Sequence, residues 1–408
     1  MSSARSQSAV PGAGAITNRT RPGRGARGLL PSGRGVLRGL GRLLLGTAIA
    51  LAIFVAFSSV MRLRSVALPG VTGQSAVGRT AIALKDAGRI DPFATDGRHR
   101  ELAVWIWYPA VPGSSGSAAP YLPAVWAPLV ADVPLSQDLT AVSTNSLADA
   151  PLEGRPPVVV LLPGLGQPVA SYSTLAEDLA SHGYAVVGIN PTESAPVVFP
   201  DGHVVPPTAL GGVMEPNVDA WYASAERVTN VWVADAQFVV KELAAAPPDI
   251  GALDFNRVAY AGHSLGGAAA FEACHQDAAC AGAVDLDGTL WTAVRHTGLR
   301  APRLLLQKAP TDACDEFCSR AAADFATVMA GDDAVRLSVA GSTHQNFSDM
   351  GLMWGIANGI ALGSIDAHRM MLITRDIVRS FLDVHVRGAP AADLTSTMAS
   401  YPELTAMP

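Results

Sequence analysis

Apolar runs and amphipathic segments alternate along much of this chain. A continuous apolar run that ends in glycine occurs at 156–166, which is typical of a strand buried on both faces of a parallel sheet, and further strands are predicted at 184–191 and 257–264. Segments with helical periodicity lie between them, at 172–183 and 219–246. This alternation predicts an α/β fold with a mostly parallel central sheet and helices on both faces.

The same patterns divide the rest of the chain into elements and domains. Further strands are predicted at 100–110, 281–288, 302–310 and 334–342, further helices at 265–276, 314–330 and 371–388, and loops at 112–120 and 195–217. We expect one main domain at 91–388, preceded by a linker and first strand at 62–90 and followed by a weakly structured tail at 389–408.

An uncharged apolar run at 43–61 follows an arginine-rich segment that has no acidic residue. Such a run is long enough to span a bilayer as a helix, and the arginines predict a disordered cytoplasmic arm at 1–42. We therefore expect a signal anchor that places the main domain outside the cytoplasm. The alternatives are a cleaved signal, for which Ala56-Phe57-Ser58 offers small residues, and a buried core helix.

Charge and cysteine content limit the kinds of binding partner and the cellular compartment that we expect for this chain. The formal net charge of -6 and the 16% of charged residues give no basic patch for a nucleic acid. Four cysteines in an exported domain predict disulfides, most simply Cys274–Cys280 and Cys314–Cys318. The two crossed pairings and buried free thiols remain open, whereas the spacing disfavours a metal site.

A G-x-S-x-G motif, Gly262 to Gly266, lies where the strand 257–264 meets the helix 265–276. In that position the motif is typical of a nucleophile elbow, a sharp turn that exposes a serine at the end of a strand. The two glycines leave room for the backbone, and the helix N-terminus favours negative charge nearby. We therefore predict that Ser264 is a nucleophile.

A serine nucleophile needs a histidine that accepts its proton and an acid that orients the histidine, in the chain order serine, acid, histidine. His344, after the last predicted strand, is the predicted base. Asp285 and Asp287 lie on the same face of one strand, so alternation leaves both open. We favour Asp287 because Gly288 beside it marks the strand end, and Asp285 is the alternative, with hydrogen bonds at the strand end as its other role.

Other residues are weaker candidates. The disfavoured histidines lie beside the elbow, on helices or before the penultimate strand: His263, His275, His296, His368 and His385. Four tryptophans are candidates for lining a substrate entrance, with ordinary packing as the alternative: Trp126, Trp221, Trp291 and Trp354.

The oxyanion hole of such a site needs two N–H donors. We predict that these are the backbone N–H groups of Leu265, after the nucleophile, and of Leu165, in the PGLG turn.

Several segments together resemble the type II platelet-activating-factor acetylhydrolase family. They are LLPGLG, LASHGY, GHSLGG and GSTHQNF, with VWIWYPA and VVFPDGHVV similar to bacterial members, and they lie between about residues 89 and 382. The resemblance implies an α/β-hydrolase fold and a Ser–Asp–His triad without a metal or other cofactor. Carried over to this chain, the triad falls on Ser264, Asp287 and His344, and the oxyanion donors on Leu165 and Leu265.

The resemblance also implies hydrolysis of short or oxidised acyl esters, notably at the second glycerol position of phospholipids. Two departures affect the expected acyl pocket: Asn190-Pro191 and Pro163 stand where family members often carry histidine. The alternatives are a cutinase-like polyester hydrolase and, from another class, a catalytically silent binding module tethered to the membrane.

Overall fold

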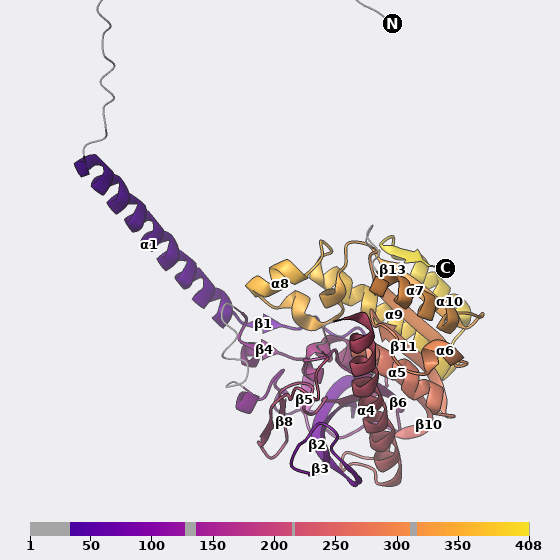
Figure 1. Cartoon of the computed structure of the whole chain (residues 1–408). Helices are drawn as coiled ribbons and strands as arrows, with labels where there is room; N and C mark the ends of the chain where they lie inside the picture. Colours follow the sequence, from indigo (N-terminus) through magenta and orange to yellow (C-terminus); the bar gives the residue numbers. More distant parts are fainter. Residues whose placement is uncertain (1–32, 127–135, 214–216, 311–315, 408) are drawn as a thin grey trace, which may run out of the picture. The chain divides into compact units, whose positions relative to one another are not determined.

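The computed structural model describes residues 33–126, 136–213, 217–310 and 316–407. Its main feature is a ten-stranded sheet with the strand order β14-β13-β12-β11-β10-β6-β7-β3-β2-β5 (Figure 1). The strands are β2 (Ala76–Ile90), β3 (His99–Ala110), β5 (Ser146–Ala148), β6 (Pro157–Leu162), β7 (Ala185–Ile189), β10 (Asp254–His263), β11 (Cys280–Leu286), β12 (Arg303–Lys308), β13 (Ala334–Val339) and β14 (Leu404–Ala406). Antiparallel pairs occur at β2–β3, β3–β7 and β13–β14, and the other pairs are parallel, which confirms the predicted α/β fold.

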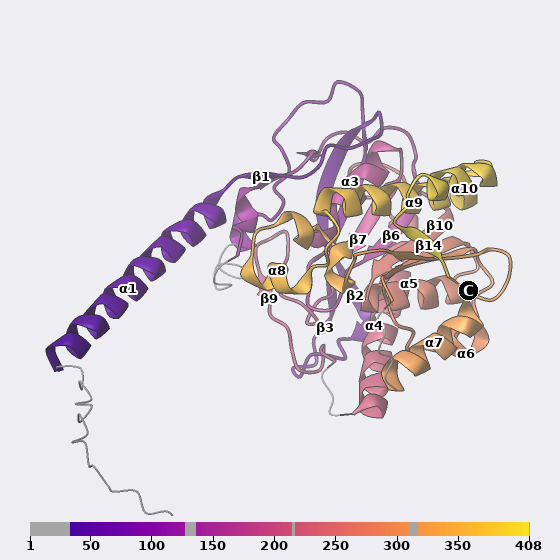
Figure 2. The same ribbon diagram turned by 90° about the horizontal axis from the view of Figure 1, so that it is seen from above.

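Helices cover both faces of this sheet. The helices of the domain are α3 (Ser173–Ser181), α4 (Val218–Ala245), α5 (Leu265–Gln276), α6 (Val294–Thr297), α7 (Glu316–Val328), α8 (Ile356–Ala361), α9 (Ala367–Arg387) and α10 (Ala391–Ala399). Figure 2 shows α3, α9 and α10 on one side of the central strands and α4 and α5 on the other. Strand β6 therefore has two buried faces, with Val159 and Leu161 in one apolar cluster and Val158 and Val160 in the other.

The N-terminal helix α1 (Gly33–Leu63) begins earlier than expected. Residues 33–42, which we expected to be part of a disordered arm, are helical and continue the apolar helix toward the N-terminus despite their four glycines; residues 1–32 lie outside the described part. The segment Leu37–Leu63 has a mean hydropathy of 2.4 and is long and apolar enough to cross a membrane. The chain divides into two compact units, Met1–Ala56 and Phe57–Pro408, and the sheet belongs to the second.

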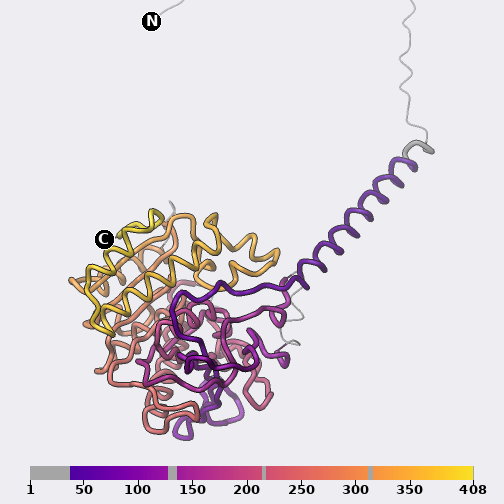
Figure 3. Tube along the Cα trace, turned by 180° about the vertical axis from the view of Figure 1, so that it is seen from behind, coloured from indigo at the N-terminus to yellow at the C-terminus, as the bar shows by residue number. Residues whose placement is uncertain are grey.

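The domain extends beyond both expected boundaries. A linker and a first strand were expected at 62–90, and strand β2 in this segment pairs along most of its length with β3, so the large sheet begins before the expected domain boundary at 91. The prediction of a weakly structured tail at 389–408 is wrong. This segment forms α10 and then β14, and β14 pairs with β13 and so covers that edge of the sheet. Leu394 and Tyr401 are buried, and the yellow C-terminal segment lies against the domain in Figure 3.

Short strand pairs stand where the patterns predicted only irregular chain. The loop expected at 195–217 contains the hairpin of β8 (Val197–Val198) and β9 (Val204–Val205). Strand β1 (Val66–Ala67) pairs with β4 (Val142–Ser143) in a separate two-stranded sheet. Strands of two residues are too short to show a periodicity that sequence analysis can detect.

Candidate active site

Ser264 lies in a sharp turn between β10 and α5, as the motif predicts. Its φ is +58°, a left-handed conformation that is strained for a residue with a side chain. A Cβ at Gly262 would collide with the Gly266 carbonyl, and one at Gly266 would collide with the Leu162 carbonyl. Both glycines are therefore required by backbone contacts, and the turn leaves the Ser264 side chain at the carboxyl end of the sheet, before the N-terminus of α5.

The three residues predicted as a triad lie in contact. Nε2 of His344 is 2.9 Å from Oγ of Ser264, and Nδ1 of His344 is 2.6 Å from Oδ2 of Asp287. A carboxylate accepts only, so Nδ1 carries the proton and Nε2 is free to accept from the serine hydroxyl. This tautomer is the one a general base beside a nucleophile requires.

Asp287 and Asp285 have different partners although they lie on one strand end. The Asp287 Oδ1 atom accepts a hydrogen bond of 2.9 Å from the backbone N–H of Lys308, at the end of the neighbouring strand β12. Asp285 is completely buried, and its Oδ1 accepts from the N–H of Gly288 at 2.7 Å, the strand-end role considered for it. Burial raises the pKa of Asp285 well above its usual range, which favours the neutral carboxyl group.

A short turn, His344–Phe347, holds the histidine after β13. The buried Asn346 side chain accepts from the N–H of Thr343 and from the N–H of Gly363, both at 2.8 Å. The Thr343 bond closes the start of the turn, and the Gly363 bond ties the turn to the segment after α8 (Ile356–Ala361), which gives the asparagine of HQNF a structural role.

A cavity of about 430 Å³ lies beside the serine and the histidine. Its walls are mostly apolar and aromatic, with Leu165, Val213, Trp221, Ala225, Leu265, Trp291 and Phe317 as lining residues. Its polar lining residues are Ser264, Asp287, Thr289, Lys308 and His344. Neither the Leu165 nor the Leu265 N–H donates a hydrogen bond to a residue that the structure describes, so both amides are free for a substrate. An apolar cavity with a few convergent polar groups is typical of a small-molecule site.

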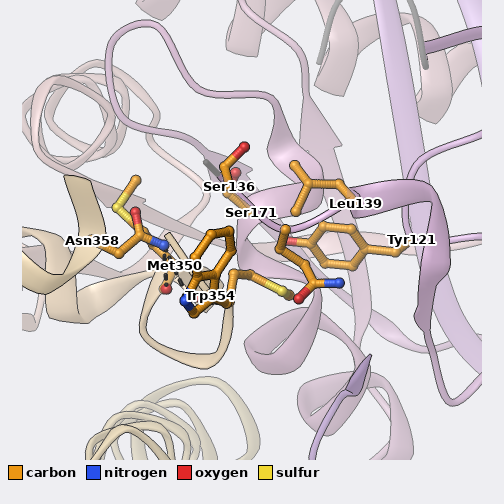
Figure 4. Close-up of a pocket in the computed structure, with 9 residues that line it drawn as sticks. Tyr121, Ser136, Leu139, Ser171, Met350, Trp354 and Asn358 are labelled. Atoms are coloured by element: carbon orange, nitrogen blue, oxygen red, sulfur yellow. Dashed lines mark hydrogen bonds between the residues drawn. The ribbon is translucent and has the colours of Figure 1, made fainter. Parts of the chain in front are cut away.

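Two of the four candidate tryptophans lie elsewhere. Trp126 is buried, and Trp354 lines a separate cavity of about 180 Å³ (Figure 4). The residues labelled there include Tyr121, Met350 and Asn358, and Asn358 Nδ2 donates to the carbonyls of Met350 and Met353. The second cavity thus has neither the serine nor the histidine among its lining residues.

The structure also shows where the predicted disulfide cysteines and Asn190 lie. Cys274 and Cys280 form a disulfide, whereas Cys314 lies outside the described residues and the pairing with Cys318 stays a prediction. The buried Asn190 does not line the large cavity; it accepts from Val169 and donates to Ala103, both backbone groups. Within the described residues, no group of three or more histidine, cysteine or carboxylate side chains could hold a metal ion.

Sequence reasoning missed five of the residues that line the cavity, among them Phe317 and Lys308, and one contact beside the site. Phe317 and Lys308 line the cavity, and Lys308 Nζ lies 3.9 Å from Asp287 Oδ2. Tyr172 and His263 are joined behind the histidine turn, with 2.7 Å between Tyr172 Oη and His263 Nδ1. His263 lies in the GHSLGG motif, but no sequence signal indicates these contacts, because they form only when distant segments pack together.

Comparisons with known proteins agree with this architecture. The family described as "Platelet-activating factor acetylhydrolase, isoform II" matches residues 225–389. A curated protein of Arthroderma benhamiae, named probable 1-alkyl-2-acetylglycerophosphocholine esterase, is 26% identical over 147 residues, which are 35% of this chain and 34% of that protein. The chain thus matches about a third of that relative's length. A solved ferulic acid esterase from Streptomyces cinnamoneus is 30% identical, with a TM-score of 0.73 over 85% of this chain and 100% of that one.

The sheet order, the strained serine turn and the position of the cavity define an α/β-hydrolase. Within that superfamily, the chain belongs to the type II platelet-activating-factor acetylhydrolase family.

Proposed function

We propose that this protein is a serine carboxylic-ester hydrolase. In this proposal Ser264 is the nucleophile, His344 the general base and Asp287 the group that orients His344. The supporting observation is the pair of contacts at 2.9 and 2.6 Å that joins the three side chains at the edge of an apolar cavity. Family membership and the named esterases among its relatives support the same activity.

The reaction has two halves. Ser264 attacks the ester carbonyl while His344 takes the hydroxyl proton, and the N–H groups of Leu165 and Leu265 stabilise the oxyanion. His344 then gives its proton to the leaving alcohol, and an acyl-enzyme remains on Ser264. Water, deprotonated by His344, attacks this acyl-enzyme and releases the acid, which restores the serine hydroxyl. These steps need water and no cofactor.

Two classes of acyl group have specific support. The curated relative's name supports short acyl esters, including acetyl groups on phospholipids, and oxidised acyl chains belong to the same hypothesis. Aromatic acyl esters are the second candidate, because Trp221, Trp291 and Phe317 line the cavity and the solved neighbour is a ferulic acid esterase.

Turnover of a panel of substrates by the purified full-length protein in detergent tests both the proposed ester hydrolysis and the proposed acyl classes. We expect turnover of p-nitrophenyl acetate and butyrate above that of palmitate, and loss of at least about 10⁴-fold in kcat for Ser264→Ala. A short-acyl phospholipid and methyl ferulate distinguish the two acyl classes. Equal turnover by Ser264→Ala and by the unchanged protein would refute the assignment, whereas a folded protein inactive on every substrate would favour the silent binding module.

We also propose that α1 anchors the protein in a membrane with the hydrolase domain outside the cytoplasm. The apolar segment Leu37–Leu63 and the arginines before it support this topology. Protease added to intact cells should remove the domain from an anchored protein. Recovery of the domain in the medium, without residues 43–61, would instead support a cleaved signal.

A further inference from the structure

His263, immediately before the nucleophile, is buried behind the histidine turn rather than in the cavity. Only 1% of its surface is exposed, and its ring lies 4.6 Å from the His344 ring, centre to centre. The Phe347 ring is stacked with the His263 ring, with 6.2 Å between the ring centres. A polar ring in such an apolar place requires hydrogen-bond partners.

Both ring nitrogens of His263 have partners, and these lie on two different loops. Nε2 is 2.9 Å from the backbone carbonyl of His344, and Nδ1 is 2.7 Å from Oη of Tyr172. The same Tyr172 oxygen accepts a hydrogen bond of 2.9 Å from the N–H of Gly164. Gly164 directly precedes Leu165, so the chain of bonds connects the loop of one predicted oxyanion donor with the backbone of the predicted base.

The direction of each hydrogen bond follows from the chemistry of the groups. A carbonyl oxygen only accepts, so Nε2 of His263 carries a proton and donates to His344. Burial and the neighbouring His344 lower the pKa of His263 to about 3, so its ring is neutral and Nδ1 has no proton. Tyr172 must therefore donate to Nδ1, and its single proton is fully used.

This direction also determines the orientation of a glutamine. The Tyr172 hydroxyl lies 2.5 Å from the atom assigned as Oε1 of Gln167. Because the hydroxyl proton is directed at His263, the Gln167 amide nitrogen must face the hydroxyl, and the two amide atoms exchange places. The Gln167 oxygen then faces the Gln345 amide, beside His344, at 3.2 Å, and a hydrogen bond between them requires that the Gln345 amide nitrogen and oxygen exchange places as well.

Close packing supports the same connection. A Cβ at Gly164 would lie 2.9 Å from His263 Nδ1 and 3.1 Å from Tyr172 Oη, so only glycine permits this approach. The oxyanion-donor loop is thus held against the Tyr172–His263 pair by both contact and hydrogen bonds.

We propose that Tyr172 and His263 are positioning residues, which fix the Gly164–Leu165 loop relative to the His344 turn through the bonds Gly164–Tyr172–His263–His344. The proposal rests on the function proposed above, because it concerns the relative placement of the oxyanion donor and the base. Neither side chain touches the substrate, and neither exchanges a proton during turnover. A misplacement of about 1 Å in such groups costs on the order of 100-fold in rate.

The test compares four single variants of the full-length protein with p-nitrophenyl butyrate. His263→Leu removes both bonds, His263→Gln keeps an N–H that can reach the His344 carbonyl, and Tyr172→Phe removes one hydroxyl. His275→Gln, an exposed histidine on α5, is the matched control. Active sites are counted by labelling with a fluorophosphonate to completion, so that kcat refers only to folded, competent protein.

We expect His263→Leu to lower kcat per labelled site by about 30- to 100-fold and Tyr172→Phe by about 10-fold, with KM changed less than about threefold. His263→Gln should recover at least a third of the lost activity on a logarithmic scale. The double variant His263→Leu, Tyr172→Phe should be no slower than His263→Leu alone, because both changes break one chain of bonds.

A merely structural role gives a different result. The variants would then melt at a lower temperature while kcat per labelled site stays within twofold of the unchanged protein, and this result overturns the proposal. If His263→Leu does not fold, Tyr172→Phe decides, because it removes only a hydroxyl. Failure of the proposed function itself is recognised separately, by equal turnover in Ser264→Ala.

Discussion

Two of the cavities in the described part of the domain, those of Trp354 and of Ser264, have similar linings but different chemistry. Both have a tryptophan and several apolar side chains in their walls, yet Ser264 and His344 meet only in the larger one among the cavities described. In the smaller cavity Asn358 holds backbone, because it donates to the carbonyls of Met350 and Met353. An apolar cavity by itself therefore does not mark a reactive site. Polar side chains that bond to one another at the carboxyl ends of parallel strands, as Ser264 and His344 do, mark it.

The largest effect should come from the acid of the larger cavity. In Asp287→Asn the amide N–H₂ would face Nδ1 of His344 and favour the wrong tautomer, so we expect kcat to fall about 10⁴-fold. Steady-state kinetics with p-nitrophenyl butyrate measures this loss.

Asp285→Asn is the matched control on the same strand. Because burial favours the neutral form of the Asp285 carboxyl and its Oδ1 accepts from the Gly288 N–H, an amide can replace it, and kcat should change less than about tenfold. Equal losses in the two variants would contradict the assignment of Asp287 as the orienting acid.

The tryptophans of the two cavities provide a direct comparison. Trp221 is 43% exposed on the wall of the larger cavity, and Trp221→Ala should raise KM for p-nitrophenyl butyrate by about 5- to 10-fold through lost contact with the substrate. Trp354→Ala should leave kcat/KM within twofold and lower the free energy of unfolding by about 1–3 kcal/mol, since Trp354 packs against Phe57. Kinetics and urea unfolding of both variants measure these effects. A larger rise in KM for Trp354→Ala than for Trp221→Ala would reverse the roles given to the two cavities.

The smallest effect concerns a buried carboxyl group beside the smaller cavity. Burial raises the pKa of Asp349, which precedes the lining residue Met350, from 3.8 to about 7. Between these values the folded protein keeps a proton that the unfolded chain has lost, so stability falls as the pH rises from about 4 to about 7. Asp349→Asn cannot titrate, and its free energy of unfolding relative to the unchanged protein should rise over this range, on the order of 2 kcal/mol.

Urea unfolding at pH 5 and pH 8 measures that difference. Above about pH 7 the gain should level off, because the carboxyl is then ionised in both states. A difference between the two proteins that is the same at both pH values would show that Asp349 does not titrate in the folded protein between them.

Much of the site could be predicted because its signals are local. The strand before Ser264, the helix after it and the two flanking glycines lie within one short segment, and the turn they form depends on backbone sterics. The expected order of serine, acid and histidine along the chain then limited which residues could be the acid and the base. The choice between Asp285 and Asp287 was harder, because strict alternation would put both on one face of the strand. In the structure the strand ends at Leu286, and Asp287 turns with a φ of +54° and meets His344, whereas Asp285 bonds to Gly288.

Other features were hidden because they depend on contacts between distant segments. Residues 389–408 have no strong periodicity, yet β14 is a strand because β13 offers it an open edge and α10 packs on α9. His263 looked incidental beside the nucleophile, since the partners that give it a role, Tyr172 and the His344 carbonyl, are 91 and 81 residues away.

The sequence by itself determined the alternation of strands and helices, the apolar N-terminal segment and the serine turn, because periodicity, hydropathy and glycine sterics act over a few residues. The tertiary structure decided which aspartate meets His344, which tryptophans line the serine's cavity and how the Gly164 loop is tied to the histidine turn. These outcomes depend on the pairing of β11 with β12 and on the packing of loops from separate strands, where the distance in space is unrelated to the distance along the chain.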